Sequence, residues 1–534
     1  MEFEWDVAIV GAGMGGAALG YSLAKAGHRV LFIEKGLSSF SQDLEDDPDT
    51  FDQEARLKNG RWPQQISGMV DARPVRFFPA LGCGAGGSTL LYAAALERFS
   101  PSDFDIIDSQ GEPAWPIGYE SLDPYYRMAE RLLQVRGSQD PLEPLAELID
   151  PPAMTACDQH FFHSTRSNGM HPYRVHTACR YVDGCDQCGG IVCHKACKQD
   201  ARSAFIEPAL ATGNAMILDR CVVERVEADD KAVRALSCRR DGETFSVAAK
   251  LYVLAAGALS TPLLLLNSAN GFWPKGLANS SDLVGRNLMF HISDFFAVWP
   301  RGRTRVSEPG KSIGLRDFYE HEGSRFGVIQ STGLTATTSN VLHFLKSVID
   351  RRGWHWFKPL MPFMRAPAMI GALIFGKATI FASIMEDLPY PENRVRPNVQ
   401  EPGAIYFEYT VHEELRERIR AFRRLYRRAF ERHKLVVLNS DINLNYGHPC
   451  GTCRFGSDPA TAVLDANNRA HDLQNLYVVD ASFFPTSGGV NPSLTIAANA
   501  LRVGAHIGAE LTAIKSGPRT GAISAAASCP TSCS

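Results

Sequence analysis

Three glycines close to the N-terminus have the spacing of a turn that binds a dinucleotide. Gly11, Gly13 and Gly16 lie between an expected strand and an expected helix, and Glu34 ends the next expected strand. The first glycine permits a tight turn, the second lets the backbone approach a pyrophosphate, and the third lets the helix pack on the strand. The Glu34 carboxylate can accept hydrogen bonds from an adenosine ribose. This arrangement predicts a dinucleotide site without separating NAD from FAD.

A second glycine-rich run, LGCGAGGST at residues 81–89, precedes an apolar stretch at 90–96. Backbone that carries no side chains can lie against a flat ring or a phosphate. We therefore expect Gly86, Gly87 and Ser88 to belong to a buried binding loop rather than to a flexible surface loop.

Five of the thirteen cysteines lie between Cys179 and Cys197. The first residues carry no secretory signal, so we expect a cytoplasmic protein in which most cysteines are reduced. In that setting a cluster indicates a metal or redox site before it indicates disulfides. Cys185, Cys188, Cys193 and Cys197 offer soft thiolates suited to iron–sulfur or zinc. An iron–sulfur cluster, a zinc ion, and structural cysteines that are free or disulfide-bonded all stay open.

Length and composition indicate an enzyme-sized globular protein. A chain of 534 residues is expected to form two or three lobes, and 45% hydrophobic with 21% charged residues is typical of a soluble fold. A net charge of −3 gives no sign of nucleic-acid binding. The apolar segment 366–385 is interrupted by Lys377, so we expect a buried helix that runs into a core strand rather than a membrane span. The alternative is that this segment lines an apolar substrate channel or forms a lip that faces a membrane.

Hydrophobic patterning predicts one parallel sheet built from segments far apart in the chain. Its expected strands are 7–10, 30–33, 251–255 and 476–479, around a helix at 14–26. A second lobe is expected within 290–446, with a strand at 405–410 and an arginine-rich helix at 413–433. We expect that helix to be solvated, although it could dock an acidic partner. The tail 516–534 is expected to be disordered.

Three C-terminal runs together resemble the signature of the glucose-methanol-choline (GMC) oxidoreductases: HPCGTCR at 448–454, NLYVVDAS at 475–482 and GGVNPSLTI at 488–496. The earlier motifs occur in that family's order, and they are the N-terminal glycine turn, the loop at 86–88, the segment from Trp115-Pro116 to Tyr125-Tyr126, and AAGA at 255–258. The resemblance covers most of the chain.

The resemblance implies an α/β fold in which a Rossmann-like FAD-binding domain is combined with a discontinuous α+β substrate domain. The FAD-binding domain is expected to comprise 1–105, 201–290 and 450–515. The substrate-binding and cap region is expected to comprise 106–200 and 291–449, including the cysteine-rich loop 179–197.

The resemblance also implies that FAD lies extended, with its adenosine end at the glycine turn and its ring near Gly86, Asp480 and Asn491. The expected cofactor-binding residues are Gly11, Gly13, Gly16, Glu34, Gly86, Gly87, Ser88, Val222, Ala256, Gly257, Asp480, Ala481, Asn491 and Pro492. No histidine occurs between Gly82 and Phe99, so the FAD is expected to be non-covalent. Leu91-Tyr92 stands where many members carry asparagine, so the local flavin contact is expected to differ.

His448 matches the family's catalytic histidine, and Asn491 matches its partner position. The chemistry agrees with this match: a neutral imidazole can accept the proton of a hydroxyl whose carbon loses hydride to a flavin. An amide can hold the oxygen but cannot take the proton. The resemblance therefore implies oxidation of an alcohol to a carbonyl compound. The substrate itself is left open: the apolar block at 354–381 favours a bulky or hydrophobic alcohol such as a sterol, whereas the cysteine run favours a sugar.

Several alternatives stay open within this scaffold. The spacing of Cys188, Cys193 and Cys197 resembles the iron–sulfur-bearing catalytic subunits of sugar dehydrogenases, which pass electrons to a separate carrier. Such a cluster favours a dehydrogenase with a protein or quinone acceptor, whereas its absence would allow oxygen. A hydroxynitrile lyase and a flavoprotein that only carries electrons are further possibilities. Glu386 resembles an acidic position of sterol-oxidising relatives and is a candidate for proton handling.

Overall fold

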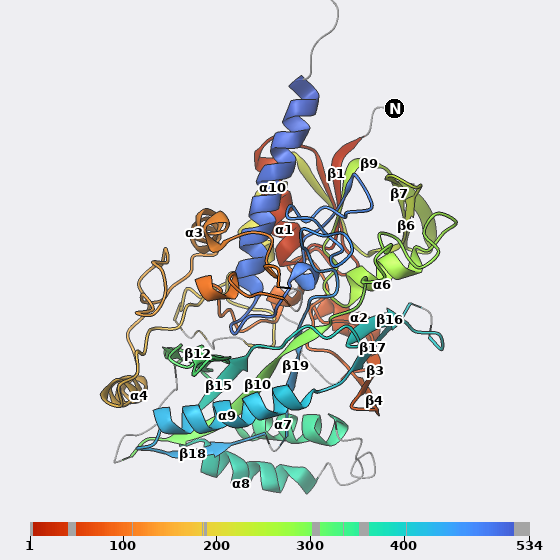
Figure 1. The fold of residues 1–534 in the computed structure, drawn as a ribbon. Helices are drawn as coiled ribbons and strands as arrows, with labels where there is room; N and C mark the ends of the chain where they lie inside the picture. Colours follow the sequence, from red (N-terminus) through yellow and green to blue (C-terminus); the bar gives the residue numbers. More distant parts are fainter. Residues whose placement is uncertain are drawn as a thin grey trace, which may run out of the picture.

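The computed structural model describes residues 4–40, 50–108, 111–183, 185, 189–301, 310–334, 336–351, 363–401, 403–439 and 441–516. Figure 1 shows two stacked parts. One part is built on a parallel sheet with two central helices, and the other on an antiparallel sheet flanked by helices. The tail prediction for 516–534 lies outside the described residues except at Ser516.

The parallel sheet has the strand order β20-β9-β1-β2-β5. Its members are β1 (Trp5–Val10), β2 (Val30–Ile33), β5 (Ala215–Leu218), β9 (Ala249–Leu254) and β20 (Leu476–Val478). All four pairings are parallel, and Val7 lies opposite both Val30 and Leu251. These strands are apolar because both faces of a parallel sheet are usually covered. The four strands predicted for one sheet are thereby confirmed, with β5 added.

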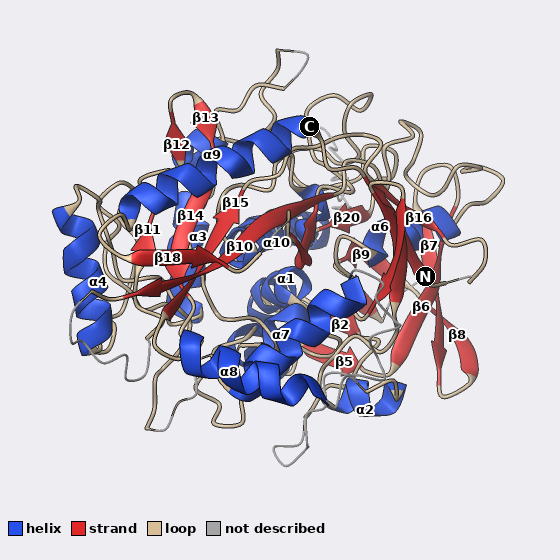
Figure 2. Cartoon of the chain, turned by 90° about the horizontal axis from the view of Figure 1, so that it is seen from below, coloured by secondary structure: helices blue, strands red, loops and turns tan. Residues whose placement is uncertain are grey.

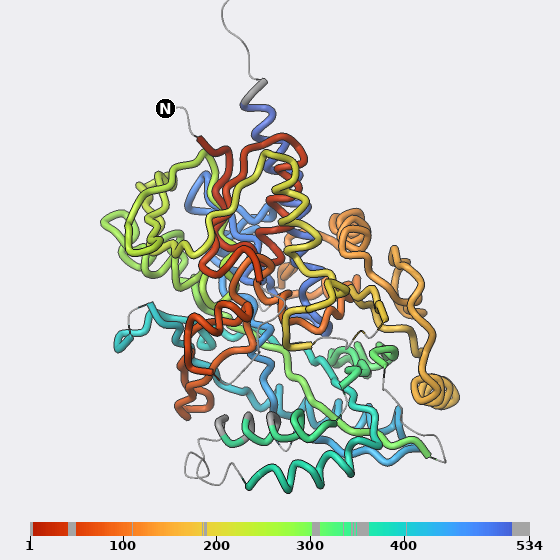
Figure 3. The backbone as a smooth tube through the Cα atoms, turned by 180° about the vertical axis from the view of Figure 1, so that it is seen from behind, coloured from red at the N-terminus to blue at the C-terminus, as the bar shows by residue number. Residues whose placement is uncertain are grey.

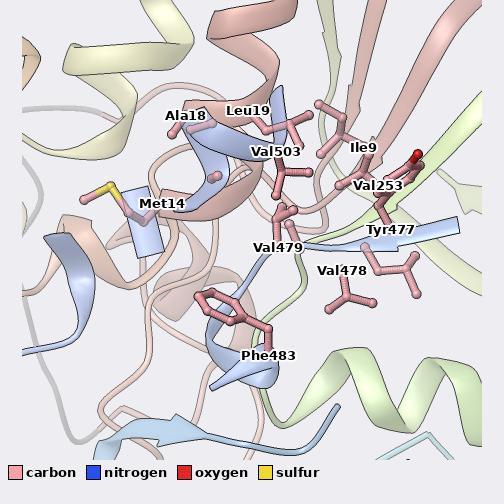
Figure 4. Packing of buried hydrophobic residues seen from close by; sticks show 14 of the residues in the cluster. Ile9, Met14, Ala18, Leu19, Val253, Tyr477, Val478, Val479, Phe483 and Val503 are labelled. Atoms are coloured by element: carbon pink, nitrogen blue, oxygen red, sulfur yellow. The ribbon is translucent and has the colours of Figure 1, made fainter. Parts of the chain in front are cut away.

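Helices α1 (Met14–Lys25) and α10 (Ser493–Ser516) pack together in this part of the molecule. Figure 4 shows Leu19 of α1 and Val503 of α10 close to Val479, which follows β20. A separate antiparallel sheet of β6 (Cys221–Ala228), β7 (Val233–Arg240) and β8 (Glu243–Val247) lies beside the parallel one.

The second part contains an antiparallel sheet with the order β11-β14-β15-β10-β18, and β19 also pairs with β10. Its members are β10 (Met289–Trp299), β11 (Gly314–Leu315), β14 (Gly327–Ser331), β15 (Thr379–Met385), β18 (Lys434–Val437) and β19 (Leu444–Cys450). The Phe296 ring of β10 stacks on Tyr426 of α9 (Glu413–Ala429). Trp299 of β10 lies three residues after Phe296, so its side chain points to the other face of the sheet. There it contacts Phe375 of α8 (Arg365–Phe375). Because strand side chains alternate, α9 and α8 cover opposite faces.

A four-stranded sheet with the order β16-β17-β3-β4 joins distant parts of the chain. It consists of β3 (Ile66–Val70), β4 (Arg73–Phe77), β16 (Arg394–Pro397) and β17 (Ile405–Tyr409). Strand β17 pairs in parallel with β3, with Tyr406 opposite Ser67. Residues predicted for the FAD-binding domain therefore share a sheet with residues predicted for the substrate domain.

The remaining helices are α2 (Gln53–Lys58), α3 (Asp123–Leu132), α4 (Ala156–Ser167), α5 (Glu207–Leu210), α6 (Ser260–Asn267) and α7 (Thr338–Arg351), and the remaining strands are β12 (Glu320–His321) and β13 (Ser324–Arg325). Helices α7 and α8 lie side by side at the end of the molecule opposite the N-terminal strand (Figures 2 and 3). Within the part of the chain that the structure covers, no helix is long and apolar enough to cross a membrane.

Two predictions about helices need correction. Segment 366–385 does pass from a helix into a buried strand, but α8 is largely exposed, and Leu373 retains 73% of its accessible surface. The arginine-rich helix ends at Ala429 and is not simply solvated. Its Arg423 forms a bidentate ion pair with the fully buried Asp294 at 2.7 and 2.8 Å.

At its N-terminal end, helix α1 approaches the residues that follow the strands closely enough for backbone to meet backbone. A Cβ atom at Gly15 would lie 2.1 Å from the carbonyl oxygen of Val479, and one at Gly16 would lie 2.2 Å from that of Gly11. Both contacts are with backbone atoms, which cannot move aside as a flexible side chain can. The two glycines are therefore required for the helix to lie where it does.

We predict that Gly15→Ala lowers the free energy of unfolding by about 1–3 kcal/mol, because the added methyl group forces α1 away from the residue that follows β20. Urea unfolding followed by tryptophan fluorescence measures the change. Gly118→Ala is the matched control, since no atom lies within 4 Å of a Cβ added there. Equal stability of the Gly15→Ala variant and the parent would contradict the packing argument.

Candidate active site

Most of the predicted cofactor-binding residues lie at one edge of the parallel sheet. Gly11 follows β1, Glu34 follows β2, Gly257 lies just beyond β9, and Asp480 lies just beyond β20. Because the strands are parallel, their carboxyl ends share an edge, and ligands of open α/β sheets bind there. Segments separated by hundreds of residues in the chain are thus brought together.

The glycine turn fits a dinucleotide. Gly11 has a φ of +98°, a conformation that residues with side chains rarely adopt, and a Cβ there would lie 2.4 Å from the carbonyl oxygen of Ala255. Gly13 is different, because the nearest atom to an added Cβ is the Gly87 Cα at 3.7 Å. The turn and the second glycine-rich run therefore meet backbone to backbone, with room beside Gly13 for a close ligand.

Glu34 is buried and hydrogen-bonded to the glycine turn. One carboxylate oxygen accepts from the Ala12 N–H at 2.9 Å, and the other accepts from the Gly36 N–H at 2.8 Å. The backbone oxygen of Glu34 accepts from Cys221 at 2.9 Å, which places Val222 beside the end of β2. The carboxylate thus holds the turn in shape, and its contact with a ribose stays a prediction.

Asp480 joins two strand ends. One oxygen accepts from the Gly257 N–H at 2.9 Å and the Thr261 hydroxyl at 2.5 Å, and the other accepts from Ser482. Burial raises the pKa of the carboxyl group above its usual value, while these hydrogen bonds oppose the rise. Ala481 begins the short helix η6 (Ala481–Phe483), which Asp480 caps. Asp480 therefore fixes the backbone at the predicted cofactor edge.

The second glycine-rich run leads into the short helix η1 (Gly87–Leu90). Gly86 and Gly87 have φ values of +110° and +55°. The Ser88 hydroxyl accepts a hydrogen bond from the Gly82 N–H at 3.2 Å, which closes the loop on itself. This loop is ordered by its own backbone. Gly86 is buried, Gly87 is partly buried and Ser88 is exposed, so the expected burial holds for only part of the loop and its binding role stays a prediction.

His448 faces a second histidine that sequence reasoning missed. Strand β19 carries His448, and its neighbour β10 carries His291. The two Nδ1 atoms are 3.2 Å apart, and the rings meet edge to face with centroids 5.1 Å apart. His291 is fully buried. Its only sequence signal was a histidine within an apolar strand, and the pairing of β10 with β19 spans about 150 residues, so spacing alone could not reveal it.

The partners of His291 fix the proton positions of the pair. The Nε2 atom of His291 lies 3.0 Å from the carbonyl oxygen of Gly488, which can only accept, so Nε2 carries the proton. The Nδ1 atom of neutral His291 is then an acceptor, and His448 must donate to it from its own Nδ1. This assignment leaves a lone pair on the Nε2 atom of His448.

Asn445 offers a competing contact, because its Nδ2 lies 3.2 Å from the His448 Nδ1. If the Nδ1 atom of His448 accepted that N–H, it would carry a lone pair instead of a proton. That lone pair would face the lone pair on the Nδ1 atom of His291, which is an unfavourable contact. Asn445 has another acceptor in the Ser293 hydroxyl at 3.4 Å. We therefore keep the assignment that follows from the Gly488 carbonyl, in which the Nδ1 atom of His448 carries the proton.

Both rings are neutral near neutral pH. Burial lowers the pKa of His448 to about 4. Burial and the neighbouring His448 lower the pKa of His291 to about 3. Desolvation disfavours the charged imidazolium form, which explains both directions. His448 can therefore accept a proton over the physiological range.

Asn491 and His448 are tied to the same short loop. His291 links His448 to the Gly488 carbonyl, three residues before Asn491. The amide of Asn491 donates to the Gln330 side chain of β14 at 3.2 Å. Gly489 receives the Val328 N–H at 3.0 Å and donates to the Tyr319 hydroxyl at 2.9 Å. Gln330 and Tyr319 are further residues that the sequence did not single out.

Helix α10 begins at Ser493, immediately after Asn491 and Pro492. The N-terminal end of a helix carries partial positive charge and unpaired N–H groups. The loop that holds Asn491 is therefore followed by a helix end that favours negative charge.

The cysteine-rich loop brings together a set of thiols that differs from the predicted one. The Sγ atoms of Cys179, Cys185 and Cys197 lie within 4.8 Å of one another. Cys193 lies 3.4 Å from Cys197. Cys188 lies outside the described residues, and Cys179 was not among the predicted ligands.

Glu386 is engaged in an ion pair. It is 1% exposed, and one oxygen lies 3.1 Å from Arg325 and 4.0 Å from Arg418. Its place beside two guanidinium groups gives it a structural role, and its suggested part in proton handling stays a prediction.

We predict that Gly13→Ala leaves the thermal stability of the cofactor-free protein nearly unchanged but reduces bound dinucleotide at least tenfold. The new methyl group makes ordinary contact with Gly87, yet it occupies the space beside the turn that a pyrophosphate would need. The ratio of flavin to protein absorbance after purification measures the loss, with Gly118→Ala as control. A Gly13→Ala variant saturated with flavin would contradict this placement.

Comparison with known proteins agrees with these features. Two family models described as GMC oxidoreductase match, one over residues 33–293 and the other over residues 389–500. Paromamine 6'-oxidase of Streptomyces fradiae is 28% identical, over 95% of this chain and 92% of that protein. The fructose dehydrogenase large subunit of Gluconobacter japonicus is also 28% identical, over 93% of this chain and 96% of that protein.

A solved structure of pyridoxine 4-oxidase from Mesorbium loti has the same fold, with a TM-score of 0.65 and 20% identity over 94% of this chain and 99% of that one. The two family models together cover more than half of the sequence. This chain therefore belongs to the GMC oxidoreductase family, which implies FAD as its cofactor and alcohols as its class of substrate.

Proposed function

We propose that the protein oxidises an alcohol to a carbonyl compound, with His448 as the acceptor of the hydroxyl proton and Asn491 as the group that holds the oxygen. The observation that carries this proposal is the 3.2 Å contact between the two Nδ1 atoms of His448 and His291. Bound FAD supplies the acceptor for the hydride that leaves the alcohol carbon.

His448 suits this role because the lone pair on its Nε2 atom takes no part in the hydrogen bond to His291. The proton of the hydroxyl moves to Nε2, and the electron pair of the broken O–H bond forms the second carbon–oxygen bond of the carbonyl group. The carbon–hydrogen bond breaks at the same time, and its electron pair leaves with the hydride, for which bound FAD would supply the acceptor. His448 becomes an imidazolium that still donates from Nδ1 to His291. A hydrogen bond from a charged donor is stronger than one from a neutral donor, so the contact with His291 stabilises the protonated form.

Asn491 supports the oxygen without competing for the proton. One N–H of its amide is directed to Gln330, and no other hydrogen bond of this side chain is present among the described residues. The second N–H can donate to the substrate oxygen as negative charge develops there. The amide of Asn491 does not titrate, so of His448 and Asn491 only His448 can take the proton.

The relatives support a polar alcohol as substrate. Paromamine 6'-oxidase, 2-methyl-1,2-propanediol dehydrogenase and the fructose dehydrogenase large subunit are each 28% identical to this chain. Their names point to hydroxyl groups on aminoglycosides, diols and sugars. They include both an oxidase and dehydrogenases, and the preference for dehydrogenase activity with a protein or quinone acceptor stays a prediction.

Anaerobic mixing with a panel of alcohols tests the proposal. The holoenzyme would be mixed with an aminoglycoside, a sugar, a diol, a sterol and an aryl alcohol, and the flavin absorbance would be followed. Bleaching with one class identifies the substrate class and an oxidoreductase at once. A lyase would consume its substrate while the flavin stays oxidised, which would overturn the proposal. Readmission of oxygen then separates an oxidase from a dehydrogenase.

We predict that His448→Ala slows flavin reduction by about 10²–10⁴-fold, the usual contribution of a general base. In the parent enzyme kcat/KM should be lost as pH falls through an apparent pKa below 6.5, because burial depresses the pKa of the ring and the base acts only when deprotonated. The variant should lack this acidic limb. Stopped-flow reduction across pH measures both effects.

The control for this variant is His171→Ala, whose ring is half exposed and pairs with Asp317 on the surface. Its reduction rate and pH profile should match those of the parent. A His448→Ala enzyme that reduces its flavin as fast as the parent would rule out the assigned role.

We predict that His291→Ala lowers kcat by at least tenfold with little change in KM, because His448 loses the acceptor that fixes its tautomer. His291→Asn should restore much of the rate, since an amide can accept from His448 and donate to Gly488 at once. Steady-state kinetics of the two variants gives the changes in kcat and in KM separately. Equal losses in both variants would show that the ring only fills space.

A further inference from the structure

Helix α8 directs its large apolar side chains to the solvent. Where α8 packs on α7 its residues are small: Ala368 is buried, and a Cβ atom added at Gly371 would lie 3.0 Å from the Val341 side chain of α7. The large side chains point away from this contact. We name the exposed set, on and just before the helix, the α8 face: Phe363, Met369, Ile370, Leu373 and Ile374. A helix on a water-facing surface normally has the opposite arrangement, with its apolar stripe against the core.

The α8 face forms one continuous patch. Met369 and Leu373 are four residues apart, as are Ile370 and Ile374, and residues at this spacing lie on the same side of a helix. Figure 2 looks onto this end of the molecule, where α8 lies beside α7. Apolar patches of this kind on a folded protein mark surfaces that bind a partner or a membrane. The α8 face therefore indicates a docking surface.

Trp299, at the end of β10, borders the α8 face. Its indole N–H donates to the carbonyl oxygen of Ile374 at 3.2 Å, and the ammonium group of Lys434 lies 5.1 Å from the centre of its ring. Tryptophan is enriched where proteins meet the headgroup region of a membrane, because its ring is apolar and its N–H is polar. A lysine there buries its apolar stem while its charge stays in water.

The ends of α8 carry further basic groups. Arg365 is the first residue of the helix, Lys377 follows its last residue by two positions, and both are exposed. Residues 363–385 contain no aspartate or glutamate. Together with Lys434, these side chains place cations around an apolar centre, which is the arrangement of helices that lie on anionic lipid.

This basic border decides between a membrane and a second copy of the chain. A two-fold contact through the α8 face would place the same patch of each copy against the other, so the two basic borders would repel each other. An anionic lipid surface attracts the same groups. With 11 residues α8 is about 16 Å long, roughly half of a hydrocarbon core of about 30 Å, so it can lie in the interface but cannot span it.

We propose that the α8 face docks the protein on an anionic lipid surface. Helix α8 lies in the plane of the interface, its large apolar side chains enter the boundary between headgroups and acyl chains, and Arg365, Lys377 and Lys434 contact the headgroups. Along β10, Trp299 lies eight residues beyond His291, which corresponds to about 26 Å. Docking therefore uses none of the residues proposed for catalysis.

Flotation of the holoenzyme with lipid vesicles tests the proposal. One set of vesicles contains phosphatidylcholine alone, and the other contains equal parts of phosphatidylcholine and phosphatidylglycerol. We expect the parent to bind the anionic vesicles at least tenfold more tightly than the neutral ones. Leu373→Glu should weaken binding to the anionic vesicles at least tenfold, because it puts a negative charge in the apolar centre of the patch.

Leu145→Glu is the matched control for this variant. Leu145 lies between α3 and α4 and retains 68% of its accessible surface, against 73% for Leu373, so both substitutions add the same charge at an equally exposed leucine. Binding of Leu145→Glu to the vesicles should equal that of the parent. Equal binding of Leu145→Glu and Leu373→Glu would overturn the proposal.

A second variant tests the charge separately. Lys377→Gln should weaken binding to the anionic vesicles about fivefold, the usual loss for one cation near such a surface, and should leave binding to neutral vesicles unchanged. Because Leu373 and Lys377 are exposed, both variants should keep the melting temperature and flavin content of the parent.

Other occupants of the α8 face give different results. A parent that binds neither kind of vesicle, or that binds both equally, would overturn the proposal. So would a dimer in sedimentation velocity that Leu373→Glu separates into monomers, since a second copy would then cover the face. These readouts do not depend on turnover, so they are separate from any failure to find an alcohol substrate.

Discussion

The close approach of helix α1 to the carboxyl edge of the parallel sheet is the constraint on which the rest of the structure depends. Glycine at positions 11, 15 and 16 lets backbone meet backbone, because each added Cβ would lie 2.1–2.4 Å from a carbonyl oxygen. The helix end can therefore reach the point where the strands finish. Since Val479 is one of those contacts, the same packing also fixes the segment that leads to Asp480 and, beyond it, to Asn491.

In the histidine pair proposed to accept the substrate proton, burial and hydrogen bonding act in opposite directions. Burial keeps both rings neutral, which makes the Nε2 atom of His448 available but opposes its protonation. The hydrogen bond to His291 partly offsets that opposition once His448 is charged. In the role proposed for His448, this balance would let the ring take the hydroxyl proton as hydride leaves the substrate and release it afterwards. A base with this balance favours the coupled reaction over simple ionisation of the alcohol.

The sequence was sufficient for features that rest on local patterns. Strand β2 begins and ends where it was predicted, and helix α1 differs from its predicted range by one residue. The glycine turn and Glu34 were also visible, because strand, turn and acid are close in the chain. His291, Gln330 and Tyr319 were not, because each acts through contacts across strands or loops more than 150 residues apart. Residue spacing carries no information about such pairings.

The arginine-rich helix illustrates the same limit and connects the surface to the site. Its charges suggested a solvated face, yet Arg423 pairs with Asp294 on β10, three residues beyond His291. Tyr426 of the same helix also donates to Asp294, at 3.0 Å. Loss of one partner of a buried ion pair typically costs 3–5 kcal/mol, because the other charge is left uncompensated. Helix α9 therefore holds in place strand β10, which carries His291, the hydrogen-bond partner of His448.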